Sequence, residues 1–209
     1  MCAMPLRDVG AWNTFRVMAP EAGSTTDAGP YRWEDFLSLD DDDRRELIDG
    51  EFLETEVPNE IHEWIVTWLV TSLTIWAQPR RAGITLPSGY KVRIRDDRGV
   101  MPDVQFFRRG RGALPQRGLD RGAPDLAVEI ISPSSKRFDR VVKLAWYASI
   151  GTPEYWVVDP VKRTLERYLL ASAGTLDLAD THQGDVRFAP ETFPELEIDL
   201  AQLWTIPEY

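Results

Sequence analysis

The most informative pattern of hydrophobic and polar positions lies between residues 122 and 160 and predicts a strand, a loop, a helix and a second strand. Successive side chains of a strand point to opposite faces. The first strand, 125–131, therefore has Leu126, Val128 and Ile130 on one face and Asp125, Ala127, Glu129 and Ile131 on the other. The Ser132-Pro133 step ends this strand. A carboxylate within an apolar run is costly unless it has a partner or a metal, so Glu129 is the first residue that needs an explanation.

Apolar residues recur at helical spacing from Ser135 to Ile150, and Gly151 and Pro153 mark the end of that helix. The second strand, 154–159, is rich in aromatic and β-branched residues. This order is compatible with a βαβ crossover, although sequence alone does not fix the direction of the strands. Within the helix, Asp139, Lys143 and Tyr147 lie four residues apart on the flank of the apolar stripe.

The remaining pattern predicts further helices and strands around this unit. Asp49-Gly50 is a strong hairpin signal at the centre of 45–56, and the apolar stripe from Glu60 to Ala77 predicts a helix that Pro79 ends. The other expected elements are a short helix at 31–39, strands within 83–95 and 101–107, a basic Gly-rich loop at 108–122, a strand at 165–170 that pairs with 154–159, and weaker strands at 176–179 and 186–188. Together they predict an α/β (α+β) fold.

Length and composition restrict the class of protein. The 209 residues fit a single domain over 31–209, preceded by a flexible leader over 1–30 that has no sustained periodicity. The longest uncharged stretch, 65–79, is too short and too polar to span a bilayer, and the N-terminus lacks the apolar centre of a secretory signal. One cysteine excludes an intrachain disulfide, so cytoplasmic residence is the default expectation. The eight tryptophans and the apolar helix leave room for a homodimer.

The net charge of −10 argues at first against a nucleic-acid partner, but its distribution along the chain changes that picture. Residues 1–65 hold 16 acidic and 5 basic residues, whereas residues 80–145 hold 15 basic and 7 acidic ones. The basic segment also carries Asp103, Glu129 and Lys143. A basic field beside carboxylates suits a phosphate-bearing substrate, whereas the other interpretation is a solvated basic loop.

The candidate chemistry is an oxygen-ligand site. The chain has no GxxxxGK[ST] loop, no GxGxxG turn and no GxSxG elbow, and its three soft ligands, Cys2, His62 and His182, are too scattered for zinc. We interpret His62, at the start of a helix, as a hydrogen-bonded surface residue rather than a ligand.

Two carboxylates from neighbouring strands, Asp103 and Glu129, could share a Mg²⁺ ion that completes its shell with water and substrate phosphate. Lys143 could reach the same pocket from the helix and position a water. Asp125 is a further acid on the Glu129 face, about 13 Å away along the strand. Alternatives remain open for each residue: Asp103 could cap a turn, Lys143 could pair only with Asp139, and Glu129 could bind a buried arginine.

These residues resemble a known family. The resemblance rests on Pro102-Asp103, on Asp125-Leu-Ala-Val-Glu129-Ile-Ile-Ser-Pro-Ser134, on Asp139, Lys143, Tyr147 and Gly151, and on Glu154-Tyr-Trp-Val-Val-Asp-Pro160, with Glu46-Leu-Ile-Asp-Gly-Glu51 and His62 in the N-terminal half. The chain is similar over residues 31–170 to the large bacterial family of restriction-endonuclease-like proteins with the Uma-type domain of unknown function, within the PD-(D/E)XK nuclease superfamily.

The resemblance implies a central mixed β-sheet flanked by helices, and Mg²⁺ (or Mn²⁺) dependent hydrolysis of phosphodiester bonds in DNA or another nucleic acid. It assigns Asp103 and Glu129 to the metal, and Glu46 as an additional acid near it. The usual lysine lies two residues after the acid, where this chain has Ile131, so Lys143 on the following helix is the candidate. Two other functions stay open: a catalytically degenerate nuclease-fold protein that acts as a binding or assembly module, and a small-molecule phosphoesterase.

Overall fold

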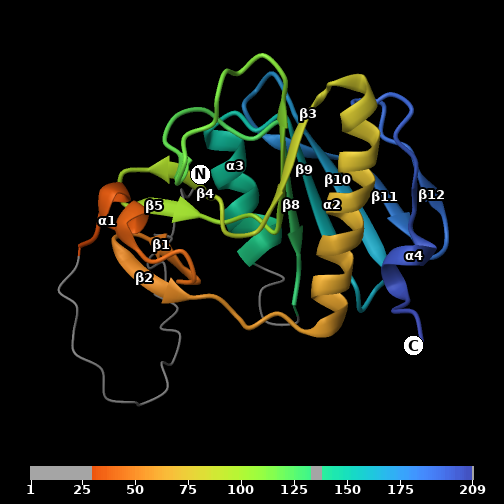
Figure 1. Cartoon of the computed structure of the whole chain (residues 1–209), viewed down its shortest axis with the longest axis horizontal. Coiled ribbons are helices and arrows are strands. Elements are labelled where there is room, and N and C mark those ends of the chain that lie inside the picture. Colours follow the sequence, from red (N-terminus) through yellow and green to blue (C-terminus); the bar gives the residue numbers. More distant parts are fainter. Residues whose placement is uncertain (1–29, 133–137, 209) are drawn as a thin grey trace, which may run out of the picture.

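A mixed six-stranded β-sheet forms the centre of the molecule in the computed structural model, which describes residues 30–132 and 138–208 (Figure 1). The strands are β3 (Gly83–Pro87), β6 (Val104–Arg108), β8 (Leu126–Ile130), β9 (Glu154–Asp159), β10 (Thr164–Leu170) and β11 (Leu176–Gln183), in the spatial order β11-β10-β9-β8-β6-β3. Neighbours are antiparallel except β8 and β9, which are parallel and joined by a helical crossover. The sequence pattern is compatible with this βαβ unit but leaves the strand direction open. The leader expected over residues 1–30 lies outside the described residues except for Pro30.

A smaller sheet stands beside the central one, in the order β2-β1-β5-β4-β7. Its strands are β1 (Arg45–Ile48), β2 (Glu51–Glu54), β4 (Lys91–Arg95), β5 (Arg98–Val100) and β7 (Gly118–Leu119), the last of which lies inside the expected loop 108–122. The predicted hairpin turn is present: Asp49 and Gly50 have φ of 54° and 83°, the positive values that a tight two-residue turn needs. Two short strands, β12 (Arg187–Phe188) and β13 (Ile198–Asp199), pair near the C-terminus.

The helices are α1 (Trp33–Ser38), α2 (Glu60–Arg80), α3 (Leu144–Ser149) and α4 (Ala201–Trp204), with a π-helical segment, η1 (Phe138–Lys143), directly before α3. The expectation that Pro79 ends the long helix is wrong, because α2 includes Pro79 and continues to Arg80. A proline in the last turn removes only one backbone donor, and the helix can tolerate that loss near its end. Within the described residues, no helix is long and apolar enough to cross a membrane.

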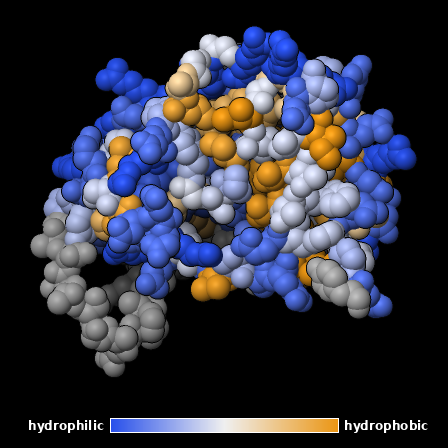
Figure 2. Space-filling view, in the orientation of Figure 1, coloured by the Kyte–Doolittle hydropathy of each residue, from blue (hydrophilic) through white to orange (hydrophobic). Residues whose placement is uncertain are grey.

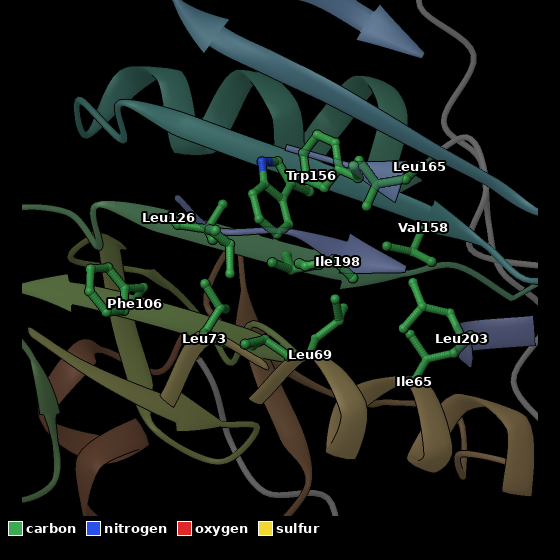
Figure 3. Close-up of a cluster of buried hydrophobic side chains, with 14 of the residues drawn as sticks. Ile65, Leu69, Leu73, Phe106, Leu126, Trp156, Val158, Leu165, Ile198 and Leu203 are labelled. Atoms are coloured by element: carbon green, nitrogen blue, oxygen red, sulfur yellow. The ribbon is translucent and has the colours of Figure 1, made fainter. Parts of the chain in front are cut away.

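The two faces of the central sheet bury different hydrophobic cores. On one face, Leu126, Val128 and Ile130 of β8 pack with the apolar stripe of α2 and with residues of the C-terminal segment (Figure 3). On the other face, Ala127 and Ile131 pack with α3 and with β4 and β5 of the smaller sheet. The alternation predicted for this strand is therefore confirmed, and β8 is buried along its whole length.

The strand predicted at 176–179 is twice as long in the structure. β11 runs to Gln183 because its backbone pairs with β10 as far as Thr164. All of its side chains except that of Leu176 are polar or exposed, as is usual at the edge of a sheet, so the hydrophobic pattern ends before the strand does.

Candidate active site

Asp103 and Glu129 meet because two antiparallel strands place them opposite each other. Val104 on β6 pairs with Val128 on β8, so the next pair outward is Asp103 and Glu129. The Asp103 Oδ2 accepts a hydrogen bond of 2.7 Å from the Ile130 backbone N–H, which fixes the carboxylate against β8. Glu129 is only 4% exposed, at the carboxyl end of its strand. Asp103 therefore ties the two strands together instead of capping a local turn.

Lys143 brings an amine to the same place from the crossover between β8 and β9. Its Nζ lies 3.1 Å from the Glu129 Oε2, 3.4 Å from the Glu46 Oε1 and 3.7 Å from the Asp139 Oδ1. The side chain is 7% exposed, so the amine faces the interior rather than bulk solvent. Lys143 therefore joins three carboxylates and does more than pair with Asp139 along its own helix.

The π-helical segment η1 is the element that carries Asp139 and Lys143 into the interior. Both residues are buried, while Val141 between them is 57% exposed. A π-helix has more residues per turn than an α-helix, and such segments often occur at functional sites. Phe138 anchors the segment with an edge-to-face contact to Trp146 of α3, their ring centroids 5.2 Å apart. The residues 135–137, where the sequence places the start of this helix, lie outside the described residues.

Glu46 comes to the site from the smaller sheet, where it lies on β1. Its Oε1 accepts a 2.9 Å hydrogen bond from the Met101 backbone N–H, just before β6. The side chain is 4% exposed. The resemblance suggested an additional acid here, and the structure places Glu46 within 3.4 Å of the Lys143 amine. The candidate site therefore lies where the two sheets meet.

Tyr147 is a site residue to which the sequence assigned no role. Its hydroxyl donates a 2.7 Å hydrogen bond to the Glu129 Oε1, so the two Glu129 oxygens have different partners, Tyr147 and Lys143. Glu129 thus binds a lysine and a tyrosine, and no arginine lies against it among the described residues. The available signal was the spacing, because Tyr147 lies one helical turn after Lys143 and shares its face. Burial raises the pKa of the Tyr147 hydroxyl well above its usual value, and the charge of Glu129 adds to the effect.

His62 also contacts the candidate site, which the interpretation as a surface residue did not foresee. Its Nε2 lies 3.3 Å from the Asp103 Oδ1, and its side chain is 19% exposed. Burial lowers the pKa of the imidazole, but the hydrogen bond and the charge of Asp103 outweigh it, so the pKa is raised overall. The Asn59 side chain caps α2 by accepting from the His62 backbone N–H, and this fixes the first turn of the helix beside β6.

The electrostatics of the cluster show an excess of negative charge. Burial raises the pKa of Glu129 well above its usual value; Asp103, Asp139 and Glu46 raise it further, and Lys143 only partly offsets them. For Lys143, burial lowers the pKa, but the surrounding carboxylates raise it well above its usual value overall. Four carboxylates thus share one lysine, and added positive charge would stabilise the group.

The donor set fits a hard divalent cation that keeps part of its own water. Oxygen ligands, an excess of carboxylates and a partly solvated Asp103 are features that Mg²⁺ prefers. Within residues 30–132 and 138–208, no three His, Cys, Asp or Glu side chains form a ready-made metal cage. A Mg²⁺ ion here would bind one or two carboxylates and complete its shell with water and substrate oxygens, as this ion often does.

Asp125 is not part of this cluster. It lies at the other end of β8, four residues and about 13 Å from Glu129. Its Oδ2 pairs with the Arg111 Nε at 2.8 Å and accepts a 2.8 Å hydrogen bond from the Arg108 backbone N–H. The candidate role of Asp125 thus receives no support from the geometry, because these contacts hold a loop.

Comparisons with known proteins agree with this fold. A solved structure described as "a putative nuclease belonging to DUF820 from Anabaena variabilis ATCC 29413" matches with a TM-score of 0.68 and 22% sequence identity, over 84% of this chain and 98% of that chain. At that identity the likeness shows the fold, and it confirms the expected nuclease-like arrangement of a mixed sheet with flanking helices. No curated protein matches the chain. The model of the Uma2 family, described as "Putative restriction endonuclease", matches residues 33–201, and the chain therefore belongs to the Uma2 family.

Proposed function

We propose that this chain is a Mg²⁺-dependent nuclease that hydrolyses phosphodiester bonds of DNA or another nucleic acid. The observation that carries the proposal is the convergence of Asp103, Glu129 and Lys143, which are far apart in the sequence, at one end of β6 and β8. Membership of a restriction-endonuclease-like family supports the same reaction class. Burial raises the pKa of the Glu129 carboxyl group, and strongly perturbed pKa values cluster at functional sites.

Asp103 and Glu129, together with the Ile130 carbonyl, would hold the Mg²⁺ (or Mn²⁺). The bound ion would supply a Lewis acid that makes water a better nucleophile and offsets charge on the phosphate. The Ile130 N–H to Asp103 hydrogen bond and the Tyr147 hydroxyl would hold the two carboxylates in place for this task.

Lys143 would act by position and charge. An ammonium group has three donors and no acceptor, so it can orient a water and stabilise a phosphate oxygen but cannot take up the proton of the water. Hydrolysis forms a bond between the water oxygen and phosphorus and breaks the bond from phosphorus to the leaving oxygen, while the attacking water loses a proton to solvent and the leaving oxygen gains one from solvent. Negative charge on the phosphoryl oxygens must be stabilised throughout, and a buried ammonium does so without reorganisation.

A second candidate, a catalytically degenerate protein that uses the nuclease fold as a binding or assembly module, is favoured by one feature. The Lys143 amine is already paired with Glu129 and Glu46, and the family's usual lysine position holds Ile131. A degenerate site of this kind would be an internal ion-pair network. Mn²⁺ titration by calorimetry separates the two candidates, because a degenerate site should show no binding that depends on Asp103.

The decisive experiment replaces each metal carboxylate by its amide. We expect Asp103→Asn and Glu129→Gln to lower Mg²⁺-dependent nicking of plasmid DNA by at least about 100-fold, because the amide oxygen carries no net charge for the ion. The matched control is Asp177→Asn, which neutralises an exposed acid on the edge strand β11; its activity should stay within about twofold of wild type.

Three readouts make the result specific. Mn²⁺ binding should weaken with the loss of nicking in both site variants and remain in the control. Wild-type nicking by both amide variants would reject the assignment. Turnover of a chromogenic phosphodiester together with no cleavage of DNA would instead identify a small-molecule phosphoesterase.

A further inference from the structure

A second concentration of charge lies at the other end of the same strands. A cavity of about 370 Å³ is lined by four arginines, Arg81, Arg108, Arg109 and Arg111, and by apolar and glycine residues of β3, β6 and the loop that follows β6. None of its lining residues is acidic, although the chain carries a net charge of −10. Figure 2 shows hydrophilic residues beside hydrophobic ones at the top of the view, where Figure 1 places the loop that follows β6.

Two of the four arginines are held by the protein, and two are not. Arg111 pairs with Asp125, and Arg108 donates to the Thr192 carbonyl at 2.6 Å while it covers the ring of Phe193. These contacts stiffen the wall of the cavity. In contrast, neither Arg81 nor Arg109 has an ion-pair partner among the described residues, and both are exposed. Two guanidinium groups thus remain available for an anion.

The backbone at Arg81 supports a role for its side chain. The residue follows the last residue of α2 with φ of 49° and ψ of 38°, a left-handed conformation that glycine adopts at the lowest cost. Arg80 is the neighbour whose side chain satisfies the helix end, by donating to the Trp76 carbonyl at 3.0 Å. A non-glycine residue in this conformation is uncommon, and here the residue lines the cavity.

The cavity and the candidate active site lie toward opposite ends of β6, and the sheet face between them is covered. Gln105 on that face is fully buried and donates to the Tyr90 carbonyl, so a nucleic acid that reaches both sites must pass over the segment that carries Tyr90. Asp103 and Phe107 lie four residues apart along the chain and therefore point to the same side, with Phe107 lining the cavity. At about 3.3 Å per residue their separation is about 13 Å. Phosphates of one strand of a duplex follow each other every 3.4 Å along the axis, so this distance corresponds to at least about four nucleotides.

We propose that this arginine cavity binds a backbone phosphate of the nucleic acid, at least about four nucleotides from the phosphate at Asp103 and Glu129. The inference rests on the proposed function and adds a place where the substrate is held. The planar guanidinium groups of Arg81 and Arg109 match phosphate oxygens, and Gly110 and Gly112, with open space where a side chain would be, let a backbone approach closely. A free nucleotide offers the same phosphate chemistry, and the test below separates the two sources.

The test removes one guanidinium without straining the fold. Arg81→Gly deletes the charge and places glycine in a conformation that suits it, so the variant should fold at least as well as wild type. The matched control is Arg163→Gly. Arg163 also has a positive φ, of 54°, but its side chain pairs with Asp185 and the residue does not line the cavity. Binding of a 20-base-pair duplex is measured without divalent metal over a range of salt concentrations.

We expect Arg81→Gly to make the negative slope of log K against log salt shallower by about 0.9. The affinity for the duplex at 100 mM salt should fall about eightfold. Arg81→Gly combined with Arg109→Gln should make the slope shallower by about 1.8, whereas Arg163→Gly should leave it unchanged. An unchanged slope in the double variant, or an equal loss in the control, would overturn the proposal.

Adenosine monophosphate is the probe for the other source. The cavity holds a free nucleotide, and the proposal fails, if two results occur together. The nucleotide binds wild type more tightly than a single phosphate contact allows and does not bind Arg81→Gly, and the salt dependence of duplex binding is the same in both proteins. Failure of the proposed function looks different: duplex binding would depend on Arg81, but Mg²⁺ would produce no cleavage. Cleavage that is insensitive to Arg81 and Arg109 would leave the nuclease assignment intact and remove only this cavity.

Discussion

At the scale of single residues, Glu129 is a candidate site residue whose burial should reduce stability. Its carboxylate is almost fully buried and lies among three other acids, with one lysine and one tyrosine within hydrogen-bonding distance. Its pKa is therefore raised, first by burial and then by the neighbouring acids. A folded state that holds such a proton more tightly than the unfolded state becomes less stable as pH rises above the usual value of about 4.5.

We therefore predict that Glu129→Gln is as stable as wild type or more stable at pH 8 without divalent metal. A neutral amide does not titrate, so it escapes the loss that the carboxylate suffers between pH 4.5 and its raised pKa. A gain of roughly 2–4 °C in Tm corresponds to about 1 kcal/mol for a chain of this size. Thermal unfolding of both proteins at pH 5 and pH 8 gives the comparison, and a larger deficit of the variant at pH 8 than at pH 5 would contradict it.

Tyr147 gives a second prediction at this scale. Tyr147→Phe removes the hydroxyl that holds the Glu129 Oε1 and keeps the aromatic ring, so Mn²⁺ affinity should fall about 10-fold or more, as outer partners of metal ligands generally show. Tyr155→Phe is the control: its ring centroid lies 5.0 Å from that of Tyr147, but its hydroxyl donates to the Asp139 backbone carbonyl. Calorimetry with Mn²⁺ should separate the variants, and equal affinity losses would reduce Tyr147 to a packing role.

At the scale of elements, the site depends on the ends of strands and on an irregular helix. β6 and β8 bring Asp103 and Glu129 together by their register, and η1 brings Lys143 to them from the crossover. The regular part of α2 has the opposite task, since it covers the far face of the sheet and packs the core. The burial of its stripe should therefore determine stability, while the exposed side of the helix should matter little.

Two substitutions on α2 test this division. Leu73→Ala deletes a fully buried side chain and should destabilise the protein by about 2–5 kcal/mol, because it leaves a cavity between the helix and the sheet. Ile75→Ala removes an aliphatic side chain that is 67% exposed two residues later and should change stability by less than about 0.5 kcal/mol. Urea unfolding measures both, and similar losses would show that the exposed side of α2 is packed against something else.

At the scale of the whole molecule, charge is separated rather than evenly spread. The chain is acidic overall, yet its central segment is basic and supplies both the carboxylate cluster and the arginine cavity, at opposite ends of β6 and β8. The smaller sheet completes the arrangement, because Glu46 reaches the Lys143 amine from β1. A nucleic-acid chain that passes over the segment carrying Tyr90 would meet both charged regions.

Much of this arrangement could be predicted where residues adjacent in sequence determine the structure. The alternation in β8 predicted both faces of that strand, and the Asp49-Gly50 pair predicted the turn between β1 and β2, because each depends on local backbone geometry. The prediction that α2 ends at Pro79 was wrong, because a proline in the last turn removes only one backbone donor. The full length of β11 was missed because its pairing partner, rather than its own pattern, determines where it ends.

The sequence by itself determined the family, the sheet-and-helix architecture and the acids worth testing, because periodicity and motif spacing are properties of neighbouring residues. Only the tertiary structure decided which side chains meet. It joined Glu46 and Tyr147 to Glu129 and Lys143, set His62 against Asp103, and left Asp125 at the far end of its strand. Those distances depend on strand register and on the path of the crossover, and such long-range packing is not encoded in any single stretch of the chain.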